Sequence, residues 1–437
     1  MARHVQPDRL VASLPSATAL ARHMPAAALF GIGLLATFLS QAFLSRVMTL
    51  AEFGTFTVLY SAGAILSGLG TLGFDLSIMR FIPSALAHGD RQAAKAFGAY
   101  SLRLVLWSSA IVGVMTSFYT SFHDHRSAVL ATILGLCAAS WTLVRYISGA
   151  LRARGHNNLC LFVDRVLRDG GLALIGGYIL LSSSLIDLTF VAIVLVILCV
   201  AGCIIGSLRL EYFNNFLLPK NTPIPKTWVT ASIGLLAVNV TELFGARIDI
   251  FLASLLINAE SAGAIGVLLT LTSLVTIPSA FINVITMPTI AHYKELGDYK
   301  KLRKLLVTST ILAFVGSAVI ASLFLVARDL IFGIFSQEAI ALVPTETFFL
   351  ILGARVLGMI SHAMAPLLMM TGGERKLISA HAISIVTKLA FCSFFLSNFD
   401  ISAVGILISF GIFSLSFLQM YFGITAFLKV CGTNNLP

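Results

Sequence analysis

The stretch FGARIDIFLASLLIN, from Phe244 to Asn258, is almost entirely apolar, yet it carries Arg247 and Asp249. Such a stretch is typical of a helix that crosses a membrane. A charged side chain there is costly and therefore marks a candidate functional site. The composition of the whole chain agrees with this environment. Of its 437 residues 58% are hydrophobic and 11% are charged, whereas a soluble protein carries about 25% charged residues. We therefore expect an integral membrane protein.

The apolar residues gather in twelve long stretches, and each can cross a hydrocarbon core of about 30 Å at 1.5 Å per helical residue. The pattern predicts an all-α integral membrane protein with about 12 transmembrane helices. The predicted spans are 25–45, 55–79, 98–118, 127–147, 160–181, 186–207, 229–257, 262–290, 304–327, 338–370, 377–397 and 401–428.

Lysine and arginine are distributed unevenly between the loops, and short cytoplasmic loops are the ones that carry an excess of them. Arg46, Arg126 and Arg328 are the basic residues of one set of loops. The N-terminal segment, the alternate loops and the C-terminus hold twenty: Arg3, Arg9, Arg22, Arg80, Arg91, Lys95, Arg145, Arg152, Arg154, Arg209, Lys220, Lys226, Lys294, Lys300, Lys301, Arg303, Lys304, Arg375, Lys376 and Lys429. The asymmetry predicts that both termini are cytoplasmic.

Two short patterns recur at an offset of 208 residues. Ala-Glu at 51–52 returns at 259–260, and Gly-Asp at 89–90 returns at 297–298. Matched spacing of this kind indicates an internal duplication. We expect a cytoplasmic segment 1–24, a six-helix bundle 25–207, a cytoplasmic linker 208–228, a second six-helix bundle 229–428 and a cytoplasmic tail 429–437. Two such bundles facing each other are typical of a transporter.

The predicted seventh span holds three charged residues. Glu242 and Asp249 are seven residues apart and share a helix face, whereas Arg247 lies about 160° around the helix from Asp249. Two interpretations remain open. The charges line a hydrated cavity, with Arg247 holding an anionic substrate and the carboxylates coupling to a cation or proton, or they pair with neighbouring helices.

Four further basic side chains lie in the tenth and eleventh predicted spans. Arg355 and His362 share the spacing i, i+7, as do His381 and Lys388. Arg355 and Lys388 could bind a phosphate group. The histidines could instead pair with other helices.

The N-terminal half has its own candidates. Arg103 either reaches the membrane surface or lines a cavity, and Asp75 and Arg80 could pair locally or form a gate. In DRVLRD (164–169) the spacing pairs Asp164 with Arg168 and Arg165 with Asp169, which predicts a self-neutralised stripe at the cytoplasmic mouth.

Several function classes lack their signatures. The chain has no soluble basic domain for nucleic acid, no metal-ligand or cofactor motif, and no catalytic motif. We therefore expect neither an enzyme nor a protein with a cofactor.

Three segments resemble a known family: FLSRVMTLAEFGTF (43–56), GLGTLGFDLSIMRFIP (68–83) and ARIDIFLASLLINAESAGAIGVL (246–268). They are similar to polysaccharide (O-antigen and exopolysaccharide) repeat-unit flippases. The tyrosine usual shortly after the glycine at 263 is absent here.

This resemblance implies a fold shared with multidrug and toxic-compound extruders, and a location in the bacterial cytoplasmic membrane. It also implies a substrate, the undecaprenyl-diphosphate-linked oligosaccharide, carried from the inner to the outer leaflet. Membrane lipids, a polysaccharide polymerase and glycosyltransferases are the partners it suggests. Two alternatives remain open: a cation-coupled multidrug extruder of the same fold, and a membrane polymerase or ligase of lipid-linked sugars.

Overall fold

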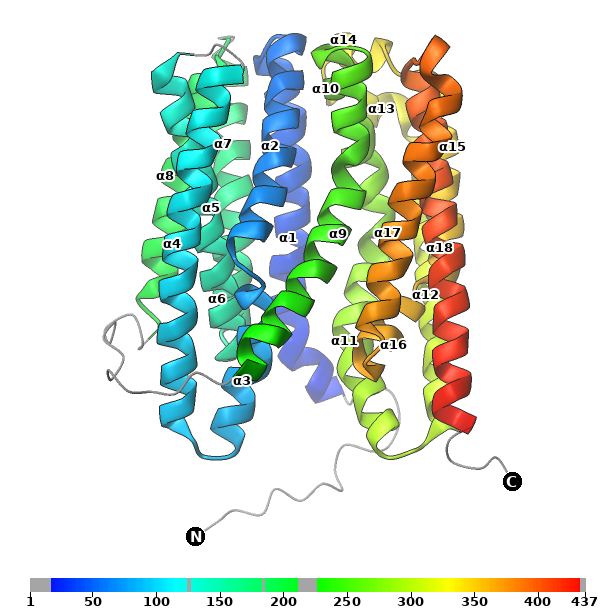
Figure 1. Ribbon diagram of the computed structural model, residues 1–437. Helices are drawn as coiled ribbons and strands as arrows, with labels where there is room; N and C mark the ends of the chain where they lie inside the picture. The colour runs from blue at the N-terminus through cyan, green and yellow to red at the C-terminus, as the bar shows by residue number, and fades with distance from the viewer. Residues whose placement is uncertain (1–16, 124–126, 183–184, 211–225, 433–437) are drawn as a thin grey trace.

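The computed structural model describes residues 17–123, 127–182, 185–210 and 226–432, and all its regular elements are helical (Figure 1). The first group of helices is called the first bundle below. Its members are α1 (Ala17–Val47), α2 (Leu50–Gly70), α3 (Phe74–Ala87), α4 (Arg91–His123), α5 (Ala128–Ala153), α6 (Asn157–Leu161), the π-helix η2 (Phe162–Leu167), α7 (Arg168–Leu181) and α8 (Leu188–Ser207).

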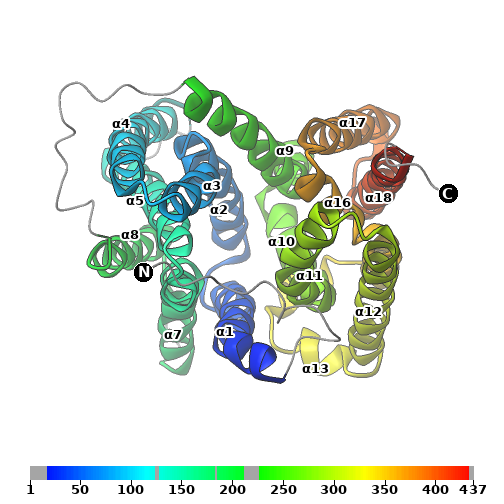
Figure 2. The same ribbon diagram turned by 90° about the horizontal axis from the view of Figure 1, so that it is seen from below.

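The remaining helices are called the second bundle, and they lie beside the first (Figure 2). They are α9 (Lys226–Leu256), α10 (Ala259–Ser273), η4 (Leu274–Thr276), α11 (Ile277–Glu295), α12 (Tyr299–Val326), α13 (Arg328–Phe332), α14 (Gln337–Ala341), α15 (Thr345–Gly358), η5 (Met359–Ser361), α16 (Met364–Thr371), α17 (Glu374–Cys392), η6 (Ser393–Asn398) and α18 (Ile401–Gly432). Elements η4, η5 and η6 are 3₁₀-helices.

The helices present apolar faces to their surroundings, as lipid requires. On α4 the exposed large side chains recur every three or four residues, at Trp107, Ile111, Met115, Phe118 and Phe122. In water such a stripe would be a docking surface, but in a bilayer it is the face in contact with the acyl chains.

Among the described residues, fewer helices qualify as candidate spans than the sequence predicts. Ten helices of the described residues are long and apolar enough to cross a membrane, or eleven if Thr345–Ser361 and Met364–Thr371, bent by 42°, form one span. The predicted span 160–181 is the one missing from this set. It is divided among α6, the π-helix and α7, and its first half carries four charged residues.

The predicted second span, 55–79, is also interrupted. Helix α2 ends at Gly70, and α3 begins at Phe74 after Leu72 and Gly73 adopt positive φ angles of 52° and 76°. A Cβ at Gly73 would collide with the carbonyl oxygen of Ser232 in α9. Glycine is therefore required at this break both for its backbone conformation and for the close approach of α9.

The two bundles meet tightly at the upper end in Figure 1, where α2 and α10 begin. At Gly54 a Cβ would collide with the carbonyl oxygen of Ala259, so the two helix starts touch through their backbones. Nearby, the Ser336 amide donates to Ser45 Oγ at 3.1 Å, and Phe38 packs edge-on against Phe335. We call this contact the upper seam.

The recurring Gly-Asp pairs have the same local structure. Gly89 and Gly297 have φ angles of 75° and 68°. The Asp90 side chain accepts from the Ala93 amide at 2.8 Å, and the Asp298 side chain accepts from the Lys301 amide at 3.1 Å. Both turns lead into a long helix, α4 or α12. The recurring sequence thus encodes the same helix start in each bundle.

Three predicted segments are described only in part. The structure does not describe residues 1–16 of the segment 1–24, residues 211–225 of the linker 208–228, or residues 433–437 of the tail 429–437.

Candidate functional site

Helix α9 connects the two bundles. It packs against α2 and α3 of the first bundle and against α10, α17 and α18 of the second. Figure 2 shows it running obliquely from the first bundle to the second. Because Glu242, Arg247 and Asp249 lie in its second half, each can interact with side chains between the bundles or within the second one.

Asp249 forms a buried ion pair with Lys388 of α17. The Lys388 Nζ atom lies 2.9 Å from Asp249 Oδ2, and the two residues are 6% and 3% exposed. The lysine side chain lies directly against Gly411 of α18, where a Cβ would overlap its Cε atom. Asp249 Oδ1 is buried and has no hydrogen-bond partner among the described residues. The carboxylate therefore keeps an unused acceptor.

Arg355 of α15 is the second cation of this region. Its Nε atom donates to Thr272 Oγ1 of α10 at 3.0 Å, and it lies within electrostatic range of Asp249. Asp249 is thus paired with one cation and lies in the electrostatic range of a second. Together Asp249, Lys388 and Arg355 carry a formal charge of +1, which an anion could balance.

Arg247 and Glu242 lie nearer to the first bundle. Arg247 is half-buried and lies within electrostatic range of Tyr60, Arg168 and Asp169. It has no hydrogen-bond or ion-pair partner among the residues that the structure describes. Glu242 is exposed and lies within electrostatic range of Arg145. Arg247 therefore offers an unused guanidinium to a ligand between the bundles.

A polar contact joins the bundles through a residue that the sequence did not single out. Arg145 Nε lies 3.0 Å from Asp75 Oδ2 of α3, and Arg145 Nη2 donates to Asn239 Oδ1 of α9 at 2.7 Å. Thr71 also donates to Asp75, at 2.9 Å. Asp75 therefore pairs with Arg145 instead of its sequence neighbour Arg80, which is exposed on α3.

The first bundle holds a second buried ion pair. Arg168 donates to both oxygens of Asp169, at 2.8 and 3.2 Å. Thr37 and Tyr60 also donate to Asp169, at 2.6 and 3.1 Å. The Arg168 guanidinium lies over the Trp141 ring, 4.6 Å from its centroid. This carboxylate has four donors and is fully satisfied.

The predicted pairing in DRVLRD is half right. Arg168 and Asp164 do approach, at 3.9 Å, but the partner of Asp169 is the adjacent Arg168 and not Arg165. Arg165 lies over the Phe30 ring. The π-helix Phe162–Leu167 changes the helical register. It places Arg168 and Asp169 in the core of the bundle and not along a stripe at the cytoplasmic mouth.

The other predicted residues are dispersed. Arg103 is half-buried on α4, and His381 is buried on α17. His362 does not continue the face of Arg355, because the 3₁₀ turn at 359–361 and the 42° bend separate them. Its Nε2 atom is buried with no hydrogen-bond partner among the described residues.

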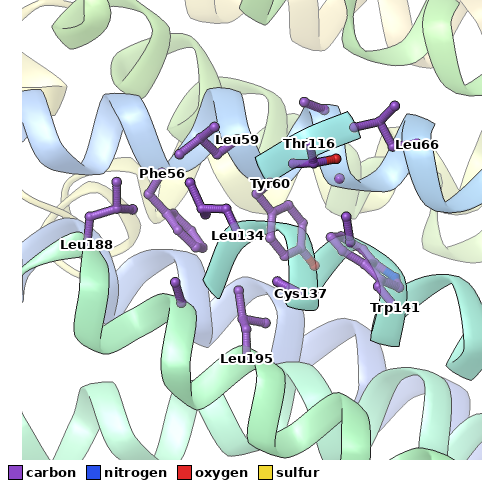
Figure 3. A pocket seen from close by; sticks show the side chains of 14 residues that line it. Phe56, Leu59, Tyr60, Leu66, Thr116, Leu134, Cys137, Trp141, Leu188 and Leu195 are labelled. Carbon is purple, nitrogen blue, oxygen red and sulfur yellow. The ribbon is translucent and has the colours of Figure 1, made fainter. Parts of the chain in front are cut away.

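An apolar cavity of about 60 Å³ lies inside the first bundle between α2, α4, α5 and α8 (Figure 3). Its walls include Phe56, Tyr60, Leu134 and Trp141, with Thr116 as one of its few polar groups. No cluster of metal-ligating side chains occurs among the described residues. The cavity therefore offers an aromatic surface, and its described lining includes no residue of α9.

The fold is that of membrane transporters of the MATE type. The structure matches an inward-facing MATE transporter of the MOP superfamily with a TM-score of 0.73 and 12% identity over 92% of this chain and 96% of that one. It matches an outward-facing MATE transporter of the same superfamily with a TM-score of 0.70 and 13% identity over 94% and 96%. A MATE structure in the bent conformation gives 0.66 and 13% over 95% and 96%.

The sequence assigns the family. Residues 27–294 match the polysaccharide biosynthesis protein family, so the chain belongs to that family. No curated protein matches the sequence. The chain is thus a multi-pass helical membrane protein of the polysaccharide biosynthesis protein family, and its fold is like that of MATE transporters. The predicted resemblance is confirmed at this level.

Proposed function

We propose that this protein is a flippase for undecaprenyl-diphosphate-linked oligosaccharide repeat units. It carries them from the cytoplasmic to the outer leaflet of the bacterial cytoplasmic membrane by alternating access of two bundles. In this proposal both termini lie in the cytoplasm, and the broken segment α6, η2 and α7 crosses the membrane as a twelfth span beside the eleven candidates. The observation that carries the proposal is Arg247, a half-buried guanidinium between the bundles that no described residue pairs. A diphosphate is an anion suited to satisfy it.

The cationic residues have different roles in this proposal. Arg247 and Arg355 bind the diphosphate directly, and Arg103 attracts it from the cytoplasmic side. Lys388 joins them only when Asp249 releases it, because the two form an ion pair at 2.9 Å. A proton or cation on Asp249 would neutralise the carboxylate and free the ammonium group. Asp249 is therefore the proposed coupling residue, with Glu242 as a second, exposed carboxylate.

The partners follow from the substrate. Glycosyltransferases supply the lipid-linked repeat unit at the inner leaflet, and a polysaccharide polymerase consumes it at the outer leaflet. Membrane lipids surround the polyprenyl tail while the sugar and diphosphate pass between the bundles.

The test uses a strain that lacks this protein, with radiolabelled lipid-linked sugars and surface polymer measured together. We expect unpolymerised lipid-linked repeat units to accumulate on the cytoplasmic side while surface polymer disappears. Arg247→Gln and Arg355→Gln should restore little polymer, although both variants remain in the membrane. The exposed Arg91→Gln at the start of α4 is the matched control. Normal polymer without the protein would refute the proposal.

The aromatic cavity favours one other candidate, a cation-coupled extruder of amphipathic drugs. Phe56, Tyr60 and Trp141 form a surface suited to a flat cation. However, the Arg168 guanidinium already lies over the Trp141 ring and would repel such a ligand. The extruder predicts that the deleted strain loses tolerance to cationic drugs and keeps its surface polymer.

A further inference from the structure

The first half of α9 is attached to the first bundle by a set of specific contacts. Ser232 donates to Ser77 Oγ of α3 at 2.7 Å, and the Trp228 ring packs edge-on against Phe97 of α4 at 4.9 Å. The second half of the same helix belongs to the second bundle through Asp249 and Lys388. If the bundles tilt relative to each other, α9 must bend or release one of these attachments.

The polar centre of the attachment is Arg145 with Asp75 and Asn239, which we call the α9 clasp. Arg145 is anchored on α5, and its side chain is 25% exposed, whereas that of Asp75 is 5% exposed. The Asp75 carboxylate is held by Thr71 as well. The hydrogen bond to Asn239 is therefore the weaker side of the clasp, because it joins a charged donor to a neutral amide.

Asn239 shows that this contact is incomplete. The residue is 7% exposed, and its Nδ2 donor has no hydrogen-bond partner among the described residues. Gly68 of α2 lies beside it, and a Cβ there would come within 3.5 Å of Nδ2 and 3.8 Å of Arg145 Nη1. A buried unpaired donor is costly. Among the described residues, the hydrogen bond from Arg145 is the one bond that holds the Asn239 side chain, so an anion that takes the guanidinium releases Asn239.

An anion that binds Arg145 must compete with the partners that the guanidinium already has, so it needs more than one negative charge. Arg145 already pairs with a carboxylate, and Glu242 adds negative charge one turn further along α9. A carboxylate or monovalent anion would gain nothing by displacing these groups. A diphosphate carries more than one negative charge and accepts bidentate hydrogen bonds from a guanidinium.

We propose that Arg145 is a substrate-sensing residue that makes the release of α9 depend on substrate. The diphosphate of the lipid-linked sugar takes the guanidinium from Asn239, and the first half of α9 then leaves α3. This proposal rests on the flippase function. It extends that function by naming the contact that prevents the bundles from moving without substrate.

The test measures cross-linking between α3 and α9 in purified protein. Ser77 and Ser232 hydroxyls are 2.7 Å apart, so a Ser77→Cys/Ser232→Cys pair can form a disulfide with little movement. Single-cysteine variants control for the native cysteines. The probe is farnesyl diphosphate, and farnesol is its uncharged control. We expect the diphosphate to slow cross-linking at least about fivefold, a typical size of coupling between sites, and farnesol to have no effect.

Two further variants distinguish loss of the α9 clasp from misfolding of the protein. With Arg145→Gln, cross-linking should be slow without ligand and should not respond to the diphosphate. Asn239→Ala, which keeps the Asp75–Arg145 pair, should give the same loss of response in a chain that still folds. Arg91→Gln should respond like the parent protein.

The outcomes separate the two proposals. Unchanged cross-linking with diphosphate, or a full response in Arg145→Gln or Asn239→Ala, overturns the clasp. If lipid-linked sugars still accumulate in the deleted strain, the flippase function survives that result. Normal surface polymer in the deleted strain refutes the function itself and the clasp with it.

Discussion

The two bundles each contain a buried ion pair, and the two pairs differ in how completely their carboxylates are satisfied. Asp169 in the first bundle receives four hydrogen bonds, from Arg168, Thr37 and Tyr60. Asp249 in the second bundle receives one, from Lys388, and its other oxygen has no partner among the described residues. A fully satisfied pair is suited to hold a fold together, and an incompletely satisfied pair is suited to change partners.

The largest expected effect is the loss of the first pair. Asp169→Asn leaves the buried Arg168 with only the more distant carboxylate of Asp164, at 3.9 Å. Breaking a buried pair costs about 3–5 kcal/mol. We expect much less folded protein and a clearly lower midpoint of thermal unfolding in detergent. Asp249→Asn should lower it less, because Lys388 loses one hydrogen bond where Arg168 loses two. If the two substitutions lowered the unfolding midpoint equally, the two ion pairs would not differ in their contribution to stability.

The next prediction concerns transport and separates the pairs by function. The double variant Asp249→Asn/Lys388→Met removes both charges of the second pair, and such replacement is often neutral for stability. We expect a normal unfolding midpoint with no surface polymer in the complementation assay. Polymer at the parental level would show that the second pair is structural, like the first.

A smaller change tests the space that Lys388 occupies. Gly411→Ala places a methyl group where the lysine side chain now lies, and overpacking costs about 1–3 kcal/mol. The ammonium group would be displaced from Asp249. We expect reduced polymer at a moderate loss of thermal stability, and Gly353→Ala, on α15 with open space around it, is the control. Full transport by Gly411→Ala would mean that the pair tolerates misplacement.

The smallest effects should come from the two threonines that contact the charged groups. Thr37→Val removes a donor to Asp169, and Thr272→Val removes the acceptor of Arg355. Each should cost about 1 kcal/mol or less, as hydrogen bonds within membranes do. We expect Thr37→Val to change only the unfolding midpoint and Thr272→Val to change only the rate of polymer export. If Thr37→Val changed only the rate of polymer export and Thr272→Val changed only the unfolding midpoint, the proposed difference between the two ion pairs would be wrong.

The sequence predicted the positions of the transmembrane helices better than the points where those helices are interrupted. The predicted span 127–147 corresponds to α5, Ala128–Ala153, because an apolar helix in lipid is defined by its own composition. The division between α2 and α3 was missed, since Gly73 is needed there for contact with Ser232, a residue far along the chain. The π-helix before Arg168 was also missed, and the Asp169 that follows it bonds to Thr37 and Tyr60, which are distant in the sequence.

For the site, the sequence indicated residues but not their partners. Asp249 and Lys388 were both candidates, yet their pairing joins positions 139 residues apart and depends on the packing of α9 on α17. Arg145 was counted among loop residues, although it lies within α5 and reaches Asp75 and Asn239. Its position inside a long apolar helix is the signal that could have identified it.

The upper seam has a mechanical consequence. Because Gly54 meets the backbone of Ala259 directly, no flexible side chain lies between the two helix starts, and in the proposed alternating access the contact would act as a fulcrum. Helix α2 extends about 24 Å from Gly54 to its end at Gly70 at 1.5 Å per residue, so a tilt of about 10° would move its lower end by about 4 Å. A rotation too small to disturb packing near the fulcrum is thus amplified into an opening at the opposite side of the membrane.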